Sequence, residues 1–287
     1  MNVKHFTPAA ASRQHVAIWA AAIAAVLALT ALFTPSSPAG ATPGHTQSGH
    51  AKPTIVIVHG AWADGSSWSK VTLRLQHDGY TVDVPPNPLR GLASDSASIA
   101  AFLSTVSGPI VLAGHSYGGA VITNAAVGNS QVKALVYVDA FIPDVGDSLV
   151  SLTQAGSCFA VPPETVFDFV QIPGAAEGVD DAYVKPNLFP GCFANGLPAA
   201  DGAVLAATQR PLATNALVEP SGTPAWATIP SWAVIGTQDH VITPDSQVAM
   251  ANNADAHITR IDAPHLSMIS NPDDVTKVIE RAAKVTS

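Results

Sequence analysis

The sequence predicts an α/β protein in which a parallel sheet carries helices on both faces. Short, continuous apolar runs rich in β-branched residues, such as TIVIV at 54–58, are typical of strands buried on both faces. From Thr54 onward such runs alternate with segments of helical pattern. Alternation of this kind produces a parallel sheet with right-handed crossovers.

The expected elements follow one another along the chain, and a patternless insertion interrupts them. After the strand 54–58 we expect strands at 80–84, 109–113, 132–138, 231–235 and 256–261, and helices at 95–106, 117–127, 244–252 and 272–285. Between Ala140 and Trp226, Pro, Gly and Phe occur without a repeating pattern. We expect this segment, about 141–226, to form a cap over one end of the sheet.

The composition excludes one class of partner. Of the 287 residues 47% are apolar, so the chain can bury a sizeable core, and only 12% are charged. Acidic residues outnumber basic ones by 21 to 13, giving a formal net charge of −8. This charge would repel a phosphate backbone, and no segment gathers basic residues. We therefore expect no binding to nucleic acid.

The N-terminus has the order of a secretory signal. Lys4 and Arg13 precede an apolar run over 16–33, which is followed by helix breakers and by the small residues AGA at 39–41. We interpret 1–41 as a cleaved signal peptide; an uncleaved membrane anchor is the alternative, because about 20 apolar residues span a bilayer. Cleavage removes two basic residues and no acid, which leaves a net charge of −10. The product would be secreted, or periplasmic and held in the cell envelope.

A tether and two cysteines lie in the exported part. Residues 42–53 are rich in Gly, Ser, Thr and Pro, as in a flexible tether, so we expect His45 and His50 to be solvated rather than metal-bound. Cys158 and Cys192 lack metal-ligand spacing, and in an oxidising compartment we expect a disulfide that holds the cap. A reactive cysteine is the alternative, but neither lies between a strand and a helix.

The sharpest motif is GHSYGG at 114–119, directly after one expected strand and directly before a helix. This is G-x-S-x-G in the context that a nucleophile elbow requires. Ser116 must sit on a tight turn, and a side chain at Gly114 or Gly118 would collide with the neighbouring strand and helix. The helix N-terminus then offers the backbone N–H of Tyr117 to a developing oxyanion. A glycine-rich turn without chemistry is the alternative.

A second motif, His59-Gly60-Ala61-Trp62, ends the first buried strand. Gly60 allows the chain to turn back under the nucleophile, so that the N–H of Ala61 can face the same oxygen as that of Tyr117. Taken alone this motif is weak, and an ordinary strand-terminating turn is the alternative.

A serine nucleophile needs a base and an orienting acid further along the chain. His265 follows the last expected strand, at the edge of the sheet where a base must stand, whereas His257 falls within that strand. Asp239 and Asp139 each follow a strand, and we favour Asp239 because its loop leaves the sheet one strand–helix unit before His265. His240 is the second candidate for the base. We expect His59 and His115 to hold loops by hydrogen bonds.

Six segments carry a family resemblance, in the order HGAWADGSSWSKV, NPLRGLASD, GHSYGGAVITNAA, ALVYVDAFIPD, IPSWAVIGTQDHVITPDSQ and PHLSMISNPDDV. Over 54–285 the chain resembles the α/β-hydrolase superfamily, and within it small bacterial esterase-like hydrolases related to plant methyl-ester esterases and hydroxynitrile lyases. The resemblance implies Ser116 as nucleophile, Asp239 as acid, His265 as base, and the N–H groups of Ala61 and Tyr117 as oxyanion hole. Because few residues precede Thr54 in the exported chain, we expect about six parallel strands.

The expected reaction is hydrolysis of small to medium apolar carboxylic esters through an acyl-enzyme, with no cofactor and no metal. Seven aromatic residues are available to line a pocket under the cap, namely Phe141, Phe159, Phe167, Phe169, Phe189, Phe193 and Trp226. Within the cap only Lys185 and Arg210 are basic, which favours an uncharged small-molecule ester. A membrane would be a partner only if the signal segment stayed uncleaved.

Three alternatives remain at this stage: a hydroxynitrile-lyase-like activity, a perhydrolase activity, and a small-molecule-binding protein without turnover. The lyases that the chain resembles carry a lysine directly after the catalytic histidine, whereas Leu266 stands there in this sequence. An aliphatic side chain cannot stabilise a cyanide anion. We therefore expect an esterase rather than a lyase.

Overall fold

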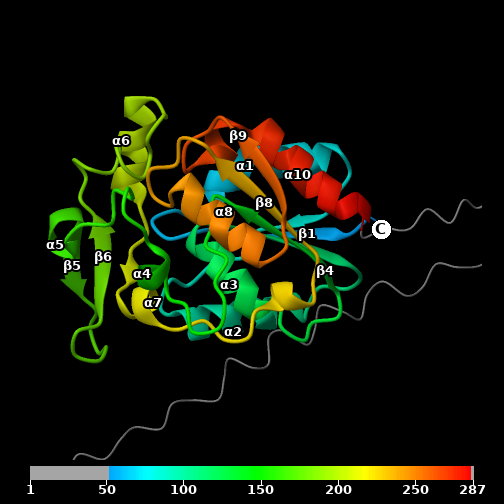
Figure 1. Cartoon of the computed structure of the whole chain (residues 1–287), viewed down its shortest axis with the longest axis horizontal. Coiled ribbons are helices and arrows are strands. Elements are labelled where there is room, and N and C mark those ends of the chain that lie inside the picture. Colours follow the sequence, from blue (N-terminus) through cyan, green and yellow to red (C-terminus); the bar gives the residue numbers. More distant parts are fainter. Residues whose placement is uncertain (1–51, 286–287) are drawn as a thin grey trace, which may run out of the picture. The chain divides into compact units, whose positions relative to one another are not determined.

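The computed structural model describes residues 52–285 and contains a six-stranded parallel sheet in the order β2-β1-β3-β4-β8-β9 (Figure 1). The prediction of an α/β-hydrolase fold with about six parallel strands is confirmed. Four of the strands consist almost entirely of buried residues, as their apolar sequences require. The strands are β1 Thr54–Val58, β2 Val82–Asp83, β3 Ile110–His115, β4 Val132–Val138, β8 Ser231–Gly236 and β9 His257–Ile261.

The strand register brings the predicted site residues to one edge of the sheet. Val58 pairs with Gly114, and His115 pairs with Val138, so the residues that follow β1, β3 and β4 leave the sheet side by side. Gly236 pairs with Ile261 in the same way at the end of β8 and β9. This carboxyl edge is where open α/β sheets bind their ligands.

Helices cover both faces of the sheet. Figure 1 shows α1 and α10 over one face and α2, α3 and α8 over the other. Every expected helix is present: the helix at 272–285 has the predicted ends, and the others differ from the prediction by one to three residues, whereas α1 was not predicted. The core helices are the 3₁₀ helix η1 Gly65–Trp68, then α1 Ser69–His77, α2 Leu92–Leu103, α3 Tyr117–Ala125, α8 Pro244–Asn253, α9 Ser267–Ser270 and α10 Pro272–Val285.

The insertion between β4 and β8 forms a cap beside the core, drawn in green to yellow in Figure 1. It holds a small antiparallel sheet, β5-β6-β7, which the sequence pattern did not reveal. The predicted disulfide between Cys158 and Cys192 is confirmed and lies within the cap, with 5.8 Å between its Cα atoms. The cap elements are α4 Leu149–Leu152, α5 Pro163–Val166, β5 Phe167–Gln171, β6 Asp180–Val184, α6 Ala199–Thr208, β7 Leu212–Ala213, α7 Asn215–Val218 and η2 Ala225–Ala227.

Two predictions concern the N-terminus. The signal peptide at 1–41 and almost all of the tether at 42–53 lie outside the described residues. Between residues 52 and 285 no helix has the length and hydropathy needed to cross a bilayer.

Candidate active site

Ser116 occupies a sharp turn between β3 and α3. Its φ of 52° lies in the left-handed region, which residues other than glycine rarely adopt. Two glycines make room for this turn: a Cβ on Gly114 would lie 2.6 Å from the carbonyl oxygen of Gly118, and a Cβ on Gly118 would overlap the carbonyl oxygen of Val58. The steric requirement predicted for both glycines is confirmed.

The residue after the serine is anchored through its side chain. The hydroxyl of Tyr117 donates a 2.8 Å hydrogen bond to Asp95, a fully buried carboxylate on α2. The backbone N–H of Arg90 donates to the same carboxylate at 3.0 Å. Burial and this carboxylate raise the pKa of Tyr117, so its hydroxyl stays a donor. The start of α3, and with it the Tyr117 N–H, is thereby fixed to α2.

The loop after β1 passes directly beneath the serine. A Cβ on Gly60 would lie 2.8 Å from the Cβ of Ser116, so only glycine fits this close approach. His59 fixes the loop as expected: its Nε2 accepts a 3.0 Å hydrogen bond from the Asn87 N–H, and its Nδ1 lies 2.9 Å from the Gly60 carbonyl oxygen. Ala61, Ser116 and Tyr117 line the same pocket.

The structure joins Asp239 and His265 in a buried pair. Nδ1 of His265 lies 2.8 Å from Oδ2 of Asp239, and both side chains are fully buried. The Asp239 carboxylate also accepts hydrogen bonds from the backbone N–H groups of Val241 and Ile242 and from Nε2 of Gln247, at 2.7 to 3.0 Å. Among the described residues, Nε2 of His265 has no hydrogen-bond partner.

Burial shifts the pKa values of both members of this pair. It lowers the pKa of the His265 imidazole far below its usual range, because an imidazolium here would lose its hydration. Burial also raises the pKa of the Asp239 carboxyl, while the hydrogen bonds from Val241 and Ile242 act in the opposite direction. The site therefore favours a neutral imidazole, the form in which Nε2 can accept a proton.

Asp139, the second candidate for the acid, points to other partners. One carboxyl oxygen accepts a 2.7 Å hydrogen bond from the Gly236 N–H, and the other accepts one from the Ser267 hydroxyl. Asp139 is fully buried, and burial together with the nearby Asp239 raises the pKa of its carboxyl. Ser267, which lies two residues after His265, was not among the predicted site residues.

Three further histidines were considered for the site, namely His115, His240 and His257. His240 is exposed, and its Nδ1 reaches the Gly191 carbonyl oxygen at 3.5 Å rather than the pocket. Nε2 of His115 lies 2.9 Å from the carbonyl oxygen of His265, so it holds the loop of the candidate base. Because a carbonyl only accepts, this Nε2 carries the hydrogen. His257 begins β9 with an exposed side chain.

An apolar pocket of about 670 Å³ opens above Ser116. Phe141, Phe159, Phe167 and Phe169 line it, as the sequence analysis anticipated. Phe189 and Phe193 are buried and do not line it; Phe193 packs against His265 and Trp62. Trp226 donates its Nε1 hydrogen to the Pro143 carbonyl. Within the described part of the chain, none of the residues lining this pocket is charged.

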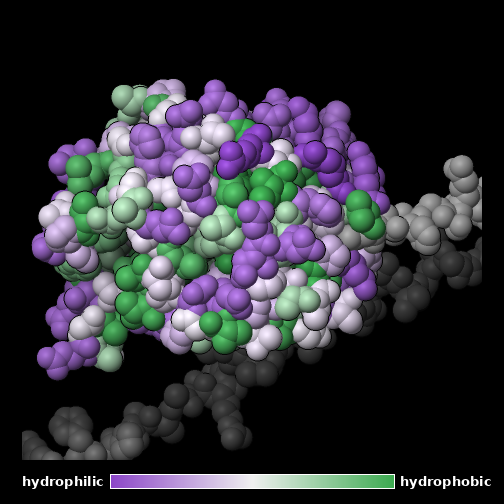
Figure 2. All heavy atoms as spheres, viewed as in Figure 1, coloured by the Kyte–Doolittle hydropathy of each residue, from purple (hydrophilic) through white to green (hydrophobic). Residues whose placement is uncertain are grey.

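The pocket continues into an apolar surface. Figure 2 shows hydrophobic residues gathered over α4 and α7, where Val150 and Val218 are 56% and 62% exposed. Both residues also line the pocket. Apolar surface therefore extends from the serine out to the solvent.

Comparisons with known proteins agree with this architecture. The model of the α/β hydrolase family matches residues 55–278, so the chain belongs to that family. An esterase of a Nocardioides species that hydrolyses carbendazim is 34% identical over 129 residues, which cover 40% of this chain and 52% of that enzyme. The match therefore spans about half the length of that relative.

Two further proteins match over more of their length. An α/β hydrolase of Aspergillus novofumigatus is 29% identical over 81% of this chain and 97% of its own. Among solved structures, an extracellular α/β-hydrolase from a Paenibacillus species, said to share structural and functional homology with tobacco salicylic acid binding protein 2, has a TM-score of 0.67. Its identity is 20%, over 81% of this chain and 99% of its own. Esterases and hydrolases among these relatives support ester hydrolysis as the general activity.

Proposed function

We propose that the chain is a serine esterase. In the first step Ser116 attacks the ester carbonyl while His265 removes the proton of the Ser116 hydroxyl. The tetrahedral oxyanion lies between the N–H groups of Ala61 and Tyr117. His265 then protonates the leaving alcohol and activates the water that hydrolyses the acyl-enzyme. Asp239 orients the imidazole and stabilises it while it is charged.

One observation carries this proposal: the Asp239–His265 pair leaves Nε2 of the imidazole buried and unpartnered among the described residues. An unsatisfied buried nitrogen costs stability, so its presence in a folded protein calls for an explanation such as a catalytic task. Ser116 supplies the task, because its strained backbone is typical of a nucleophile elbow.

The substrate class follows from the pocket. A volume of about 670 Å³ accommodates a small to medium ligand, and its phenylalanine walls favour apolar acyl and alcohol groups. The polar side-chain groups among its described lining residues belong to Trp62, Ser116, Tyr117, Thr153 and Thr214, and the Trp62 indole N–H already bonds to the Ala182 carbonyl. The hydroxyl of Tyr117 already bonds to Asp95, so an ionised substrate would find no counter-charge here.

Export is part of the proposal. The signal-like segment 1–41 would direct the chain out of the cytoplasm. A disulfide is typical of proteins that fold in an oxidising compartment, and the similar Paenibacillus hydrolase is extracellular.

Replacement of the nucleophile tests the proposal. Ser116→Ala should lower turnover of p-nitrophenyl acetate and butyrate by a factor on the order of 10⁶ and abolish labelling by a fluorophosphonate probe. Ser104→Ala is the matched control: Ser104 is exposed and directly follows α2, so this variant should retain full activity. More than a few per cent of residual activity in Ser116→Ala would rule out the assigned nucleophile.

Comparison with a cyanohydrin substrate separates an esterase from a lyase and from a binding protein. Leu266 is buried beside His265, and the stretch 263–272 contains no Lys or Arg, so nothing there holds a cyanide anion. We expect ester turnover to exceed cyanide release from mandelonitrile by about 10² or more. Faster cyanide release would indicate a lyase, and no turnover of either substrate would indicate a binding protein.

A further inference from the structure

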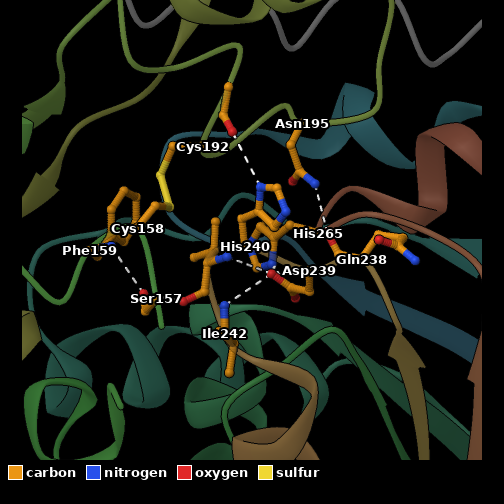
Figure 3. Close-up of a disulfide and its surroundings, with 12 residues drawn as sticks. Ser157, Cys158, Phe159, Cys192, Asn195, Gln238, Asp239, His240, Ile242 and His265 are labelled. Carbon is orange, nitrogen blue, oxygen red and sulfur yellow. Dashed lines mark hydrogen bonds and ion pairs between the residues drawn. A yellow bond between two sulfur atoms is a disulfide. The ribbon is translucent and has the colours of Figure 1, made fainter. Parts of the chain in front are cut away.

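The disulfide joins two segments of the cap that both hold the loop carrying Asp239. This loop, residues 238–242, is called the acid loop below. Cys158 and Cys192 are 34 residues apart in sequence, and each has neighbours that bond to the acid loop. Figure 3 shows Asp239, His240 and His265 among the residues that surround the disulfide.

The first segment, residues 157–159, is bonded to the part of the acid loop that follows Asp239. The hydroxyl of Ser157 donates a 2.6 Å hydrogen bond to the carbonyl oxygen of Val241. The backbone N–H of Cys158 donates a 2.8 Å hydrogen bond to the carbonyl oxygen of His240. Ser157 is nearly buried, so water does not readily replace these bonds.

The second segment, residues 191–195, is bonded to the same loop on both sides of Asp239. Nδ2 of Asn195 donates a 2.7 Å hydrogen bond to the carbonyl oxygen of Gln238. The carbonyl oxygen of Gly191 lies 3.5 Å from Nδ1 of His240. The two segments therefore hold the carbonyl groups on both sides of Asp239.

The position of the carboxylate depends on this loop. Oδ1 of Asp239 accepts hydrogen bonds from the N–H groups of Val241 and Ile242, which belong to the acid loop itself. A shift of the loop backbone would therefore carry the carboxylate with it. Its bond to His265 is 2.8 Å long, so a displacement of about 1 Å would break the alignment on which proton transfer depends.

The disulfide also brings together the aromatic residues beside the base. Phe193, next to Cys192, lies edge-on to His265 with 5.2 Å between ring centroids. Phe193 and Phe159, next to Cys158, both pack edge-on against Trp62. The same bridge thus supports the neighbours of the acid, the base and the Ala61 loop.

We infer that the Cys158–Cys192 disulfide, with Ser157 and Asn195, positions Asp239 for catalysis. The bridge fixes the distance between two cap segments, and the two segments fix the acid loop between them. This role rests on the proposed function of Asp239 as the triad acid. Loss of the bridge therefore lowers kcat, and it does so only while Asp239 is present.

A double-mutant cycle tests the inference. The double variant C158S/C192S should label with a fluorophosphonate about 10- to 100-fold more slowly than the parent protein. In the Asp239→Asn background the same pair of changes should alter the labelling rate less than twofold, because no carboxylate remains to be positioned. Equal losses in both backgrounds would indicate a purely structural bridge and would overturn the inference.

Single variants keep the test decisive if the double variant does not fold. Ser157→Ala and Asn195→Ala should each lower kcat several-fold with little change in KM. Thr208→Ala is the matched control: it removes an internal cap hydrogen bond, to the Val204 carbonyl on α6, that does not involve the acid loop. If Asp239→Asn alone leaves the labelling rate unchanged, the proposed acid is wrong. If Asp239→Asn slows labelling while the changes at Ser157, Asn195 and the two cysteines do not, only the positioning role fails.

Discussion

The indole of Trp62 ties the loop beneath Ser116 to the cap: its Nε1 donates a 2.8 Å hydrogen bond to the carbonyl oxygen of Ala182. The two residues are 120 positions apart in sequence. The backbone N–H of Trp62 also donates to a cap carbonyl, that of Arg210, at 3.0 Å. Because Trp62 follows Ala61 directly, the cap restrains the backbone that would supply half of the oxyanion hole.

Trp62→Phe should reduce both stability and turnover. The phenyl ring keeps part of the aromatic packing, but the buried Ala182 carbonyl loses its donor, which costs about 1 to 3 kcal/mol. We expect kcat to fall as well, because the Ala61 N–H is less well held. Trp226→Phe removes a comparable bond to the Pro143 carbonyl and is the matched control. Urea unfolding and ester kinetics should show similar destabilisation in both variants, with a lower kcat in Trp62→Phe alone.

The two buried aspartates should respond differently to replacement by asparagine. Asp239→Asn should lower kcat by about 10⁴, because an amide beside Nδ1 stabilises the wrong tautomer of His265 and cannot stabilise its charge. Asp139→Asn should cost less than about tenfold. An amide oxygen can still accept from the Gly236 N–H, and its NH₂ group can donate to the Ser267 hydroxyl, so both partners keep a hydrogen bond. Steady-state kinetics of both variants decide this, and the reverse order would make Asp139 the acid.

Activity should persist into mildly acidic solution. A base works only when unprotonated, so kcat/KM falls as the pH drops through the pKa of His265. Burial lowers that pKa below its ordinary value of 6.5, and the acid limb of the profile should therefore lie below pH 6.5. A profile of kcat/KM against pH, with an ester whose leaving group does not titrate in this range, measures the midpoint. A midpoint above pH 7 would contradict the assigned environment.

Removal of the disulfide should lower the free energy of unfolding. In the chain-entropy model, closing a loop with a separation of 34 residues stabilises the folded state by about 3 to 4 kcal/mol. Urea titration of the C158S/C192S variant against the parent protein measures the loss. A difference in the free energy of unfolding below about 1 kcal/mol would contradict this prediction. It would mean that the parent and the variant have similar unfolded ensembles.

The core was predictable because its strands and helices have strong local signals. The strand 132–138 was placed without error, since apolar residues fill it except at the exposed Lys133, and such runs are typical of buried parallel strands. The elbow was predictable as well, because Gly114 and Gly118 have a local steric cause. The pairing of Asp239 with His265 followed from their positions at the ends of β8 and β9.

The cap was expected as an insertion, but its internal structure and the supporting polar residues were not predictable in this way. The strand β5 exposes four of its five residues, so it has neither an apolar run nor clean alternation. Ser157, Asn195 and Ser267 act on residues 84, 43 and 128 positions away, respectively. No local pattern encodes a bond over such a separation. Helix α1 was missed because its apolar stripe holds only two buried residues, Val71 and Leu75.

The cap leaves the core after β4 and rejoins it at β8, and these two strands are paired neighbours in the sheet, with Leu135 opposite Ser231. A cap of another family member could thus be transplanted between them without altering the sheet. Such a chimera would inherit a new substrate pocket, since most of its walls come from the cap. It would also lose the bonds from Ser157 and Asn195 to the acid loop. Recombination in this lineage should therefore succeed only where the cap and the acid loop are exchanged together.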